Sequence, residues 1–275
     1  MENIELILRD TGVIPVIKLD DEQQAVPLGN ALLEGGIPAA EITFRTPAAA
    51  KSIEKLASAL PEMFVCAGTV LSVEQAKLSV ECGAKAVISP GTNREVVEWC
   101  LQNHIPVYPG CATPTEVESA LGMGLTTVKL FPAEVVGGVK MLKALYGPYR
   151  GVRFMPTGGI SPQNVKEYLS QPNVIACGGS WLCPAQDMEE GNWKAITQRA
   201  KECMELVREA RQGKGPPLKE KTKSPPDWEG FFLFKLNVIP RWNPRTLPRR
   251  HRQSRTPGSR RSRGRQCCPL PASRR

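Results

Sequence analysis

The feature that most constrains the fold is a regular alternation of two kinds of segment along the first 210 residues. Short runs rich in β-branched and apolar residues are each followed by a stretch with helical spacing, and this unit occurs eight times. The runs predicted to form strands are residues 13–19, 39–44, 63–67, 84–89, 105–108, 126–131, 152–156 and 174–177. The stretches predicted to form helices are 21–34, 47–59, 73–82, 93–103, 114–122, 137–146, 162–170 and 193–210.

Alternating strands and helices predict an α/β fold in which helices cover a parallel sheet. Eight units without an internal boundary predict a closed (β/α)8 barrel, the TIM barrel. An open, doubly wound sheet is the alternative, but it usually has fewer strands and a glycine-rich turn after the first one. Here the first strand leads into Lys18-Leu19-Asp20-Asp21, which cannot cradle a pyrophosphate. We therefore expect one barrel domain over residues 1–212.

The last part of the chain differs sharply in composition. The whole chain of 275 residues carries a net charge of +9, yet residues 211–275 hold 18 Lys and Arg against only 3 acidic residues. Residues 213–275 also carry ten prolines and Arg/Ser/Pro clusters, so we predict a basic extension without a folded core, most of it disordered. Such a tail could contact RNA or DNA through phosphates, but it has no recognition motif. We favour the alternative that it is out-of-frame or fused sequence without a selected function.

The cysteines and the first residues predict a reducing compartment. No run approaches the 18 apolar residues that a membrane span needs, and the Met-Glu-Asn-Ile-Glu start is unlike a signal peptide. The nine cysteines show no C-x-x-C spacing, and there are two histidines. We expect a cytoplasmic protein with reduced, buried cysteines, no metal and no cofactor.

A lysine in the sixth predicted strand is the first candidate for chemistry. Lys129 stands between Val128 and Leu130, and strand side chains alternate, so Lys129 is expected to point into the barrel. Burial disfavours the charged form of lysine and favours a nucleophilic amine, as imine-forming enzymes need. The competing interpretation is a lysine that reaches the rim or pairs with a carboxylate. A rival, Lys18, is expected to be a rim lysine paired with Asp20 or Asp21.

The second predicted strand strengthens the case for Lys129. Period-two alternation places Glu41, Thr43 and Arg45 on one face, and strands 2 and 6 of an eight-stranded barrel lie opposite each other. A carboxylate and a lysine facing one cavity suit imine chemistry with a general acid/base. Arg45, nearer the open end, suits a substrate carboxylate. A purely structural Glu41–Lys129 ion pair remains the alternative.

Paired glycines follow the last two predicted strands, in Pro156-Thr157-Gly158-Gly159-Ile160-Ser161 and Ala176-Cys177-Gly178-Gly179-Ser180. Glycines let backbone N–H groups approach an anion closely, and the loops after strands 7 and 8 form the usual phosphate site of this barrel. Each pair alone could simply make a tight turn. Both pairs in these two loops predict a phosphorylated substrate.

Six motifs together resemble the bacterial 2-keto-3-deoxy-6-phosphogluconate (KDPG) aldolases, a family also described as 4-hydroxy-2-oxoglutarate (KHG) aldolases. The motifs are E-I-T-F-R-T (41–46), C-A-G-T-V (66–70), I-S-P-G (88–91), V-K-L-F-P-A-E (128–134), P-T-G-G-I-S (156–161) and G-G-S-W-L (178–182). The resemblance covers about residues 5–210. It implies a metal-free class I aldolase of the Entner–Doudoroff pathway, usually a homotrimer, that cleaves the phosphorylated 2-keto acid to pyruvate and glyceraldehyde 3-phosphate.

The resemblance also implies a role for each motif residue. Lys129 corresponds to the Schiff-base lysine, Glu41 to the general acid/base and Arg45 to a substrate-binding residue. Thr69 and Pro90 correspond to contacts with the pyruvyl part. The phosphate end would be held by Thr157, Gly158, Gly159 and Ser180. Another phosphate-binding barrel, an isomerase or synthase with Lys129 as an electrostatic clamp, remains the alternative, and the preference among KDPG, its C4 epimer and KHG stays open.

Overall fold

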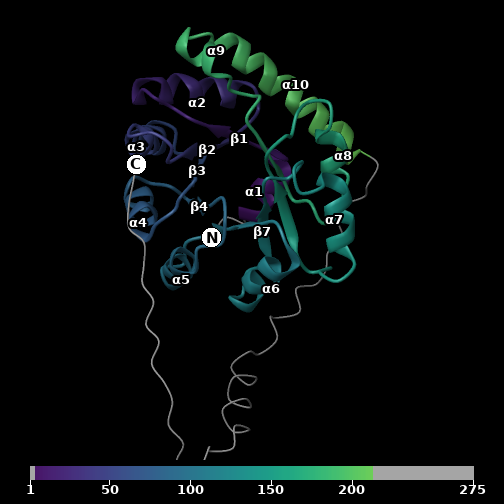
Figure 1. Cartoon of the computed structure of the whole chain (residues 1–275). Helices are drawn as coiled ribbons and strands as arrows, with labels where there is room; N and C mark the ends of the chain where they lie inside the picture. Colours follow the sequence, from purple (N-terminus) through teal and green to yellow (C-terminus); the bar gives the residue numbers. More distant parts are fainter. Residues whose placement is uncertain (1–3, 213–275) are drawn as a thin grey trace, which may run out of the picture. The chain divides into compact units, whose positions relative to one another are not determined.

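The computed structural model describes residues 4–212, and within them it shows a ring of parallel strands surrounded by helices (Figure 1). The strands are β1 (Val13–Ile17), β2 (Ala39–Thr43), β3 (Phe64–Gly68), β4 (Ala86–Ile88), β5 (Val107–Tyr108), β6 (Gly110–Cys111), β7 (Thr127–Leu130), β8 (Arg153–Pro156) and β9 (Cys177–Gly179). The helices are α1 (Ile4–Thr11), α2 (Ala25–Glu34), α3 (Ala49–Ala59), α4 (Val73–Glu81), α5 (Arg94–Gln102), α6 (Pro114–Gly122), α7 (Gly138–Tyr146), α8 (Val165–Leu169), α9 (Ala185–Glu189) and α10 (Trp193–Arg211), with a 3-10 turn, η1 (Glu22–Gln24), before α2.

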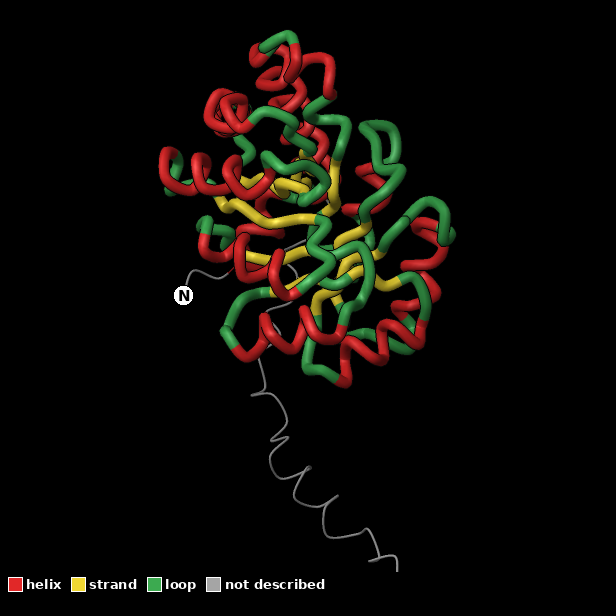
Figure 2. Tube along the Cα trace, turned by 60° about the vertical axis from the view of Figure 1, so that its left-hand side comes forward, coloured by secondary structure: helices red, strands yellow, loops and turns green. Residues whose placement is uncertain are grey.

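The strands close into the predicted (β/α)8 barrel. Hydrogen-bonded neighbours run in the orders β5-β4-β3-β2-β1-β9 and β6-β7-β8, and every pairing is parallel. Only Pro109 separates β5 from β6, so these are two pieces of one barrel strand, interrupted at a residue that has no N–H for the ladder. Two parallel bridges, Phe154–Val174 and Thr157–Gly178, join the edge at β8 to β9. Figure 2 shows the strands inside and the helices outside.

Local sequence explains where several of the outer helices begin. Three helices that follow strands, α4, α5 and α6, have a polar N-cap residue with extended backbone, namely Ser72, Asn93 and Thr113. The side chain of each cap accepts a hydrogen bond from a backbone amide in the first turn of its helix. At α6 the cap is reciprocal, because Glu116 reaches back to the Thr113 amide and Pro114 occupies the first turn, where a missing N–H costs nothing. These caps start each helix at the carboxyl end of a strand, so the βα loops stay short.

Two apolar clusters fill the structure. The larger lies between strands and outer helices and includes Val128 and Leu130 from β7. The smaller lies inside the barrel and consists of Leu8, Ile14, Ala39, Phe64, Cys66, Ala86, Ile88, Tyr108, Met155, Ile175 and Ala176. Leu8 comes from α1, which lies directly before β1 and therefore covers the amino-terminal end of the strands. The opposite, carboxyl-terminal ends of the strands are therefore the place to look for an active site.

The structure corrects two sequence predictions. A strand over 174–177 was expected, but β9 spans Cys177–Gly179, so Gly178 and Gly179 lie in the strand rather than in the loop after it. Glycine is needed in the strand at 178 because a Cβ there would lie 2.8 Å from Cγ2 of Thr157. Helices α1 and α9 were not predicted, because they lie outside the strand–helix alternation. The remaining strands and helices agree with the predictions to within a few residues.

The predicted tail, residues 213–275, lies outside the described residues, and so does the expectation that it is disordered. The division of the chain at residue 212 therefore stays a prediction. Within residues 4–212, no helix is both long and apolar enough to cross a membrane.

Candidate active site

Seven of the nine predicted site residues lie just beyond the carboxyl ends of strands, and the other two lie within strands. Because the strands are parallel, these ends meet on one side of the barrel, where the active sites of such barrels are found. Glu41 and Lys129 lie within β2 and β7. Arg45, Thr69, Pro90, Thr157, Gly158, Gly159 and Ser180 follow β2, β3, β4, β8 and β9 by one to three residues.

Lys129 and Glu41 meet inside the barrel. The neighbours Val128 and Leu130 belong to the outer apolar cluster, so the Lys129 side chain points the other way, as expected. Its Nζ atom lies 3.2 Å from Oε1 of Glu41, and the two side chains are only 6% and 2% exposed. The lysine ammonium also lies 5.5 Å from the ring centre of Phe131. An acid and a base in direct contact, screened from bulk water, can exchange a proton.

Gly68 makes room for the Glu41 carboxylate. A Cβ atom built on Gly68 would lie 2.8 Å from the carboxyl carbon of Glu41, closer than any real side chain could approach. The Glu41 side chain therefore lies across the backbone of β3 at this position. Cys66, two residues earlier on β3, is buried beneath it; desolvation, with a smaller contribution from the Glu41 charge, raises the pKa of that thiol well above its usual range. Sequence reasoning missed Gly68, although a glycine inside a strand is a recognised sign of close approach.

Two backbone features shape the mouth next to this pair. Thr69 has a φ of +55°, a left-handed conformation that a β-branched residue rarely adopts and that is typical of functional sites. Gly110 of β6 pairs with Lys129 in the sheet register and packs its Cα against the carbonyl of Pro90. A side chain at Gly110 would push the Pro90 loop away, so Pro90 is held beside the strand that carries the lysine.

The two cations that follow β1 and β2 are exposed at the rim of the barrel. Arg45 is exposed, two residues beyond the end of β2, while the Thr43 hydroxyl donates a 2.8 Å hydrogen bond to the Ile17 carbonyl. Lys18 is exposed and lies 2.6 Å from Asp20, which confirms the rim ion pair expected for it. Arg45 is thus an exposed cation in the turn that follows β2, the strand that carries Glu41.

The loop after β8 has a backbone conformation that glycine adopts readily and other residues rarely do. Gly158 and Gly159 both have positive φ, at +99° and +81°, and Thr157 is buried. The Ala133 amide donates a hydrogen bond of 2.8 Å to the Thr157 carbonyl, so the loop after β7 packs against the loop after β8. Thr157 bridges to Gly178, and Ser180 is exposed after β9. The four residues predicted for the phosphate end therefore lie in adjoining segments.

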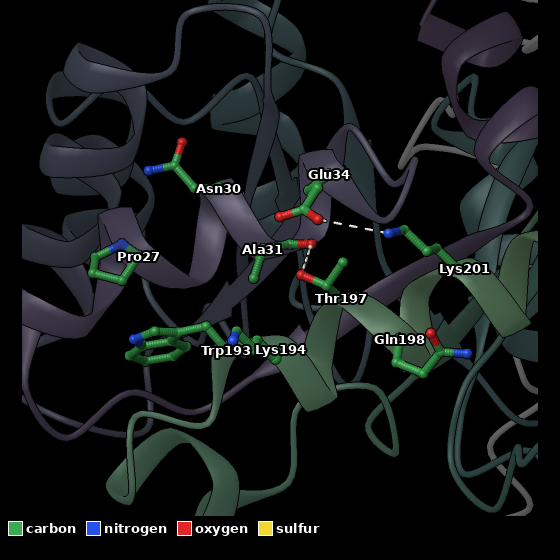
Figure 3. Close-up of a pocket in the computed structure, with 9 residues that line it drawn as sticks. All are labelled: Pro27, Asn30, Ala31, Glu34, Trp193, Lys194, Thr197, Gln198 and Lys201. Carbon is green, nitrogen blue, oxygen red and sulfur yellow. Dashed lines mark hydrogen bonds and ion pairs between the residues drawn. The ribbon is translucent and has the colours of Figure 1, made fainter.

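Two grooves on the outside of the barrel share no residue with this site. One, of about 510 Å³, lies between α2 and α10 and is lined by Pro27, Asn30, Ala31, Glu34, Trp193, Lys194, Thr197, Gln198 and Lys201 (Figure 3). Thr197 donates to the Ala31 carbonyl across it at 3.0 Å, and Lys201 pairs with Glu34 at 3.6 Å. The other runs along α10 near Trp181. Among residues 4–212 there is no cluster of three or more His, Cys, Asp or Glu side chains that could hold a metal ion.

Comparison with known proteins agrees with this geometry. The family model "KDPG and KHG aldolase" matches residues 4–199. The 2-dehydro-3-deoxy-phosphogluconate aldolase of Treponema pallidum is 46% identical over 200 residues, which are 73% of this chain and 95% of the relative. The KHG/KDPG aldolase of Escherichia coli K12 is 43% identical over 201 residues, 73% of this chain and 94% of the relative.

A solved structure adds a chemical parallel. The KDPG aldolase of Legionella pneumophila, crystallised with pyruvate captured as a covalent carbinolamine intermediate, superposes with a TM-score of 0.70 at 41% identity, covering 72% of this chain and 96% of that one. Sequence, fold and the buried lysine–carboxylate pair thus agree. This chain belongs to the KDPG and KHG aldolase family.

Proposed function

We propose that this protein cleaves 2-dehydro-3-deoxy-6-phosphogluconate to pyruvate and glyceraldehyde 3-phosphate through a Schiff base on Lys129, and that it also accepts 4-hydroxy-2-oxoglutarate. The observation that carries the proposal is the buried contact of 3.2 Å between Lys129 and Glu41. Relatives that bear the names of these activities support the choice of substrates.

The first half of the reaction forms the imine. Glu41 accepts a proton from Lys129, and the neutral Nζ attacks the C2 ketone of the substrate to give a carbinolamine. The 3.2 Å distance between Nζ and Oε1 supports a direct transfer between the two side chains. Glu41 then returns the proton to the departing hydroxyl, which leaves as water, and a protonated imine remains.

The second half breaks the carbon–carbon bond. Glu41 removes the proton from the C4 hydroxyl, the C3–C4 electron pair moves into the protonated imine, and the aldehyde leaves. The resulting enamine takes up a proton at C3, and water hydrolyses the imine to release pyruvate and free Lys129. Proton transfer by one positioned carboxylate is the kind of assistance worth about 10²–10⁴ in rate.

The surrounding residues bind the two ends of the substrate. Arg45, an exposed cation beyond β2, binds the carboxylate through its planar fork of donors, and Thr69 and Pro90 border the pyruvyl part. Thr157, Gly158, Gly159 and Ser180 hold the phosphate. The positive φ values of the two glycines and the burial of Thr157 support this assignment.

Borohydride reduction with pyruvate tests the proposal. Reduction converts an imine on Lys129 to a stable secondary amine, which peptide mass spectrometry locates. We expect the adduct on Lys129 in the wild type and none in Lys129→Ala, with Lys18→Ala as a matched control that keeps it. Absence of an adduct in folded wild-type protein would refute imine chemistry and favour a phosphate-binding isomerase or synthase in which Lys129 is an electrostatic clamp.

The homotrimeric state, the cytoplasmic location and the absence of a nucleic-acid partner remain predictions that rest on the resemblance and on composition. Light scattering on the purified full chain measures the trimer directly.

A further inference from the structure

The loop after β7 carries a carboxylate that the reaction does not use. Glu134 is an exposed residue, yet its Oε1 atom accepts a hydrogen bond from the hydroxyl of Tyr168 on α8. The Tyr168 side chain is only 1% exposed and is among the largest fully buried side chains of residues 4–212. A buried phenol thus holds a carboxylate at the edge of the site.

The glycine-rich loop after β8 is packed directly against this pair. The Glu134 amide donates to the Gly158 carbonyl at 3.1 Å. A Cβ atom on Gly159 would lie 2.6 Å from Cβ of Glu134, so the Glu134 side chain runs over the Gly159 backbone. On the other side, the Asn164 side-chain amide donates to the Gly159 carbonyl at 2.9 Å, and its oxygen accepts from the Ser161 amide at 2.8 Å.

A third glycine leaves space for the hydrogen bond itself. Gly138, at the start of α7, has a φ of +53°, and a Cβ there would lie 2.6 Å from the Tyr168 hydroxyl and 2.9 Å from Oε1 of Glu134. Burial, followed by the hydrogen bond to Glu134, raises the pKa of the Tyr168 phenol above its usual range. The phenol is therefore protonated, and able to donate, at neutral pH.

We propose that the Tyr168–Glu134 hydrogen bond is a positioning contact for the phosphate end of the substrate: it fixes the loop after β7 and, through it, the backbone of Gly158 and Gly159. This rests on the proposed function, because it assumes that the glycine loop binds phosphate. Without the bond, the Glu134 side chain no longer anchors the loop after β7, so the backbone of Gly158 and Gly159 loses the position that suits a phosphate. The loss then falls on phosphorylated substrates and spares the lysine.

Steady-state kinetics of Tyr168→Phe with two substrates tests this. Phenylalanine keeps the buried ring and removes only the hydroxyl. We expect the KM for 2-dehydro-3-deoxy-6-phosphogluconate to rise about tenfold, as the loss of a hydrogen bond to a charged group does, with kcat within about twofold of the wild type. The KM for 4-hydroxy-2-oxoglutarate, which has no phosphate, should not change.

A matched tyrosine provides the control. Tyr149 donates to Glu118 at 2.9 Å on the outer surface, so Tyr149→Phe loses the same kind of bond away from the site and should leave both KM values unchanged. Glu134→Ala should reproduce the effect of Tyr168→Phe. Glu134→Gln keeps an oxygen that accepts the phenol hydrogen bond, and it should restore the KM to within about threefold of the wild type.

Four outcomes would overturn the inference. Equal rises in KM for both substrates would mean that the substitution disturbs the whole site. No rise for either substrate would mean that the Tyr168–Glu134 hydrogen bond does not contribute to substrate binding. A Glu134→Gln variant as impaired as Glu134→Ala would assign the effect to charge instead of the hydrogen bond. A wild-type enzyme that forms the Lys129 adduct but cleaves no phosphorylated acid would overturn this inference and the phosphorylated substrate of the proposed function, whereas a wild type without the adduct would also refute the imine mechanism.

Discussion

The Nζ atom of Lys129 lies 3.2 Å from Oε1 of Glu41, although the two residues are 88 positions apart in the chain. They come from β7 and β2, which lie opposite each other in the ring, and both are buried. A buried ion pair usually adds little net stability, because desolvation of both charges offsets their attraction. Removal of one partner, however, leaves an unpaired buried charge.

This asymmetry predicts a double-mutant result. We expect Lys129→Met to lower the free energy of unfolding by about 3–5 kcal/mol, because the Glu41 carboxylate loses its partner. Lys129→Met/Glu41→Gln, with neither charge, should recover much of that loss. Urea unfolding of the two single variants and the double variant measures the coupling. A double variant as unstable as the sum of the singles would contradict a direct pair.

Loss of the Glu41 charge should slow catalysis while the protein stays folded. Glu41→Gln keeps the shape of the side chain but cannot accept a proton, so we expect kcat to fall by about 10²–10⁴. Glu54→Gln is the matched control, because Glu54 forms an exposed ion pair with Lys51 at 2.6 Å. A Glu41→Gln enzyme with wild-type kcat would remove Glu41 from the mechanism.

The space at Gly68 should matter as much as the carboxylate that fills it. In Gly68→Ala the new methyl group would lie 2.5 Å from Cγ of Glu41, so the side chain has to leave its position beside Lys129. We expect kcat to fall at least about tenfold, as a misplaced catalytic group does. Gly122→Ala meets no atom within 4 Å and serves as the control. Unchanged kinetics in Gly68→Ala would show that Glu41 can act from another rotamer.

The cap of α6 should make a measurable, pH-dependent contribution to stability. Hydrogen bonds, first from the Ala112 amide, lower the pKa of Glu116. A lowered pKa in the folded state means that the contribution is full above the unfolded value of about 4.3 and is lost as pH falls through the folded value. Thr113→Ala should cost about 1 kcal/mol at neutral pH.

Thermal unfolding between neutral and acidic pH measures both effects. Thr115→Ala, an exposed substitution on the same helix, is the control and should change little. In Glu116→Gln the part of the pH dependence that belongs to this cap should disappear. If Glu116→Gln kept the wild-type pH dependence, the cap would not be its source.

The thiols of the barrel should differ in reactivity with burial. Desolvation raises the pKa of Cys100 to about 11 and that of Cys183 to about 12, so neither forms appreciable thiolate at pH 8. Cys82 is only half-buried, and of the seven free cysteines in residues 4–212 it should react first with iodoacetamide. Peptide mass spectrometry over a time course tests the order. Labelling of Cys183 before Cys82 would contradict the burial of the former.

Local pattern sufficed to predict the architecture and most of the motif positions. Strand and helix periodicities depend on neighbouring residues, so eight alternations predicted the barrel, and Lys129 between Val128 and Leu130 predicted an inward lysine. The same reasoning failed at β9, where a glycine is needed at position 178 because Thr157, one residue beyond the neighbouring β8, occupies the space that a Cβ would need. It also missed α1, whose Leu8 is buried only because the barrel interior lies behind it.

By itself, then, the sequence determined the order of strands and helices, the inward face of β7 and the motifs that indicate an aldolase, because each is encoded by residues close together in the chain. Only the tertiary structure decided the contacts that depend on ring closure: the 3.2 Å approach of Lys129 to Glu41, the fit of Gly68 against that carboxylate, and the hydrogen bond from Tyr168 to Glu134. These join residues from distant segments, and their distances follow from barrel geometry and packing, which no local pattern records.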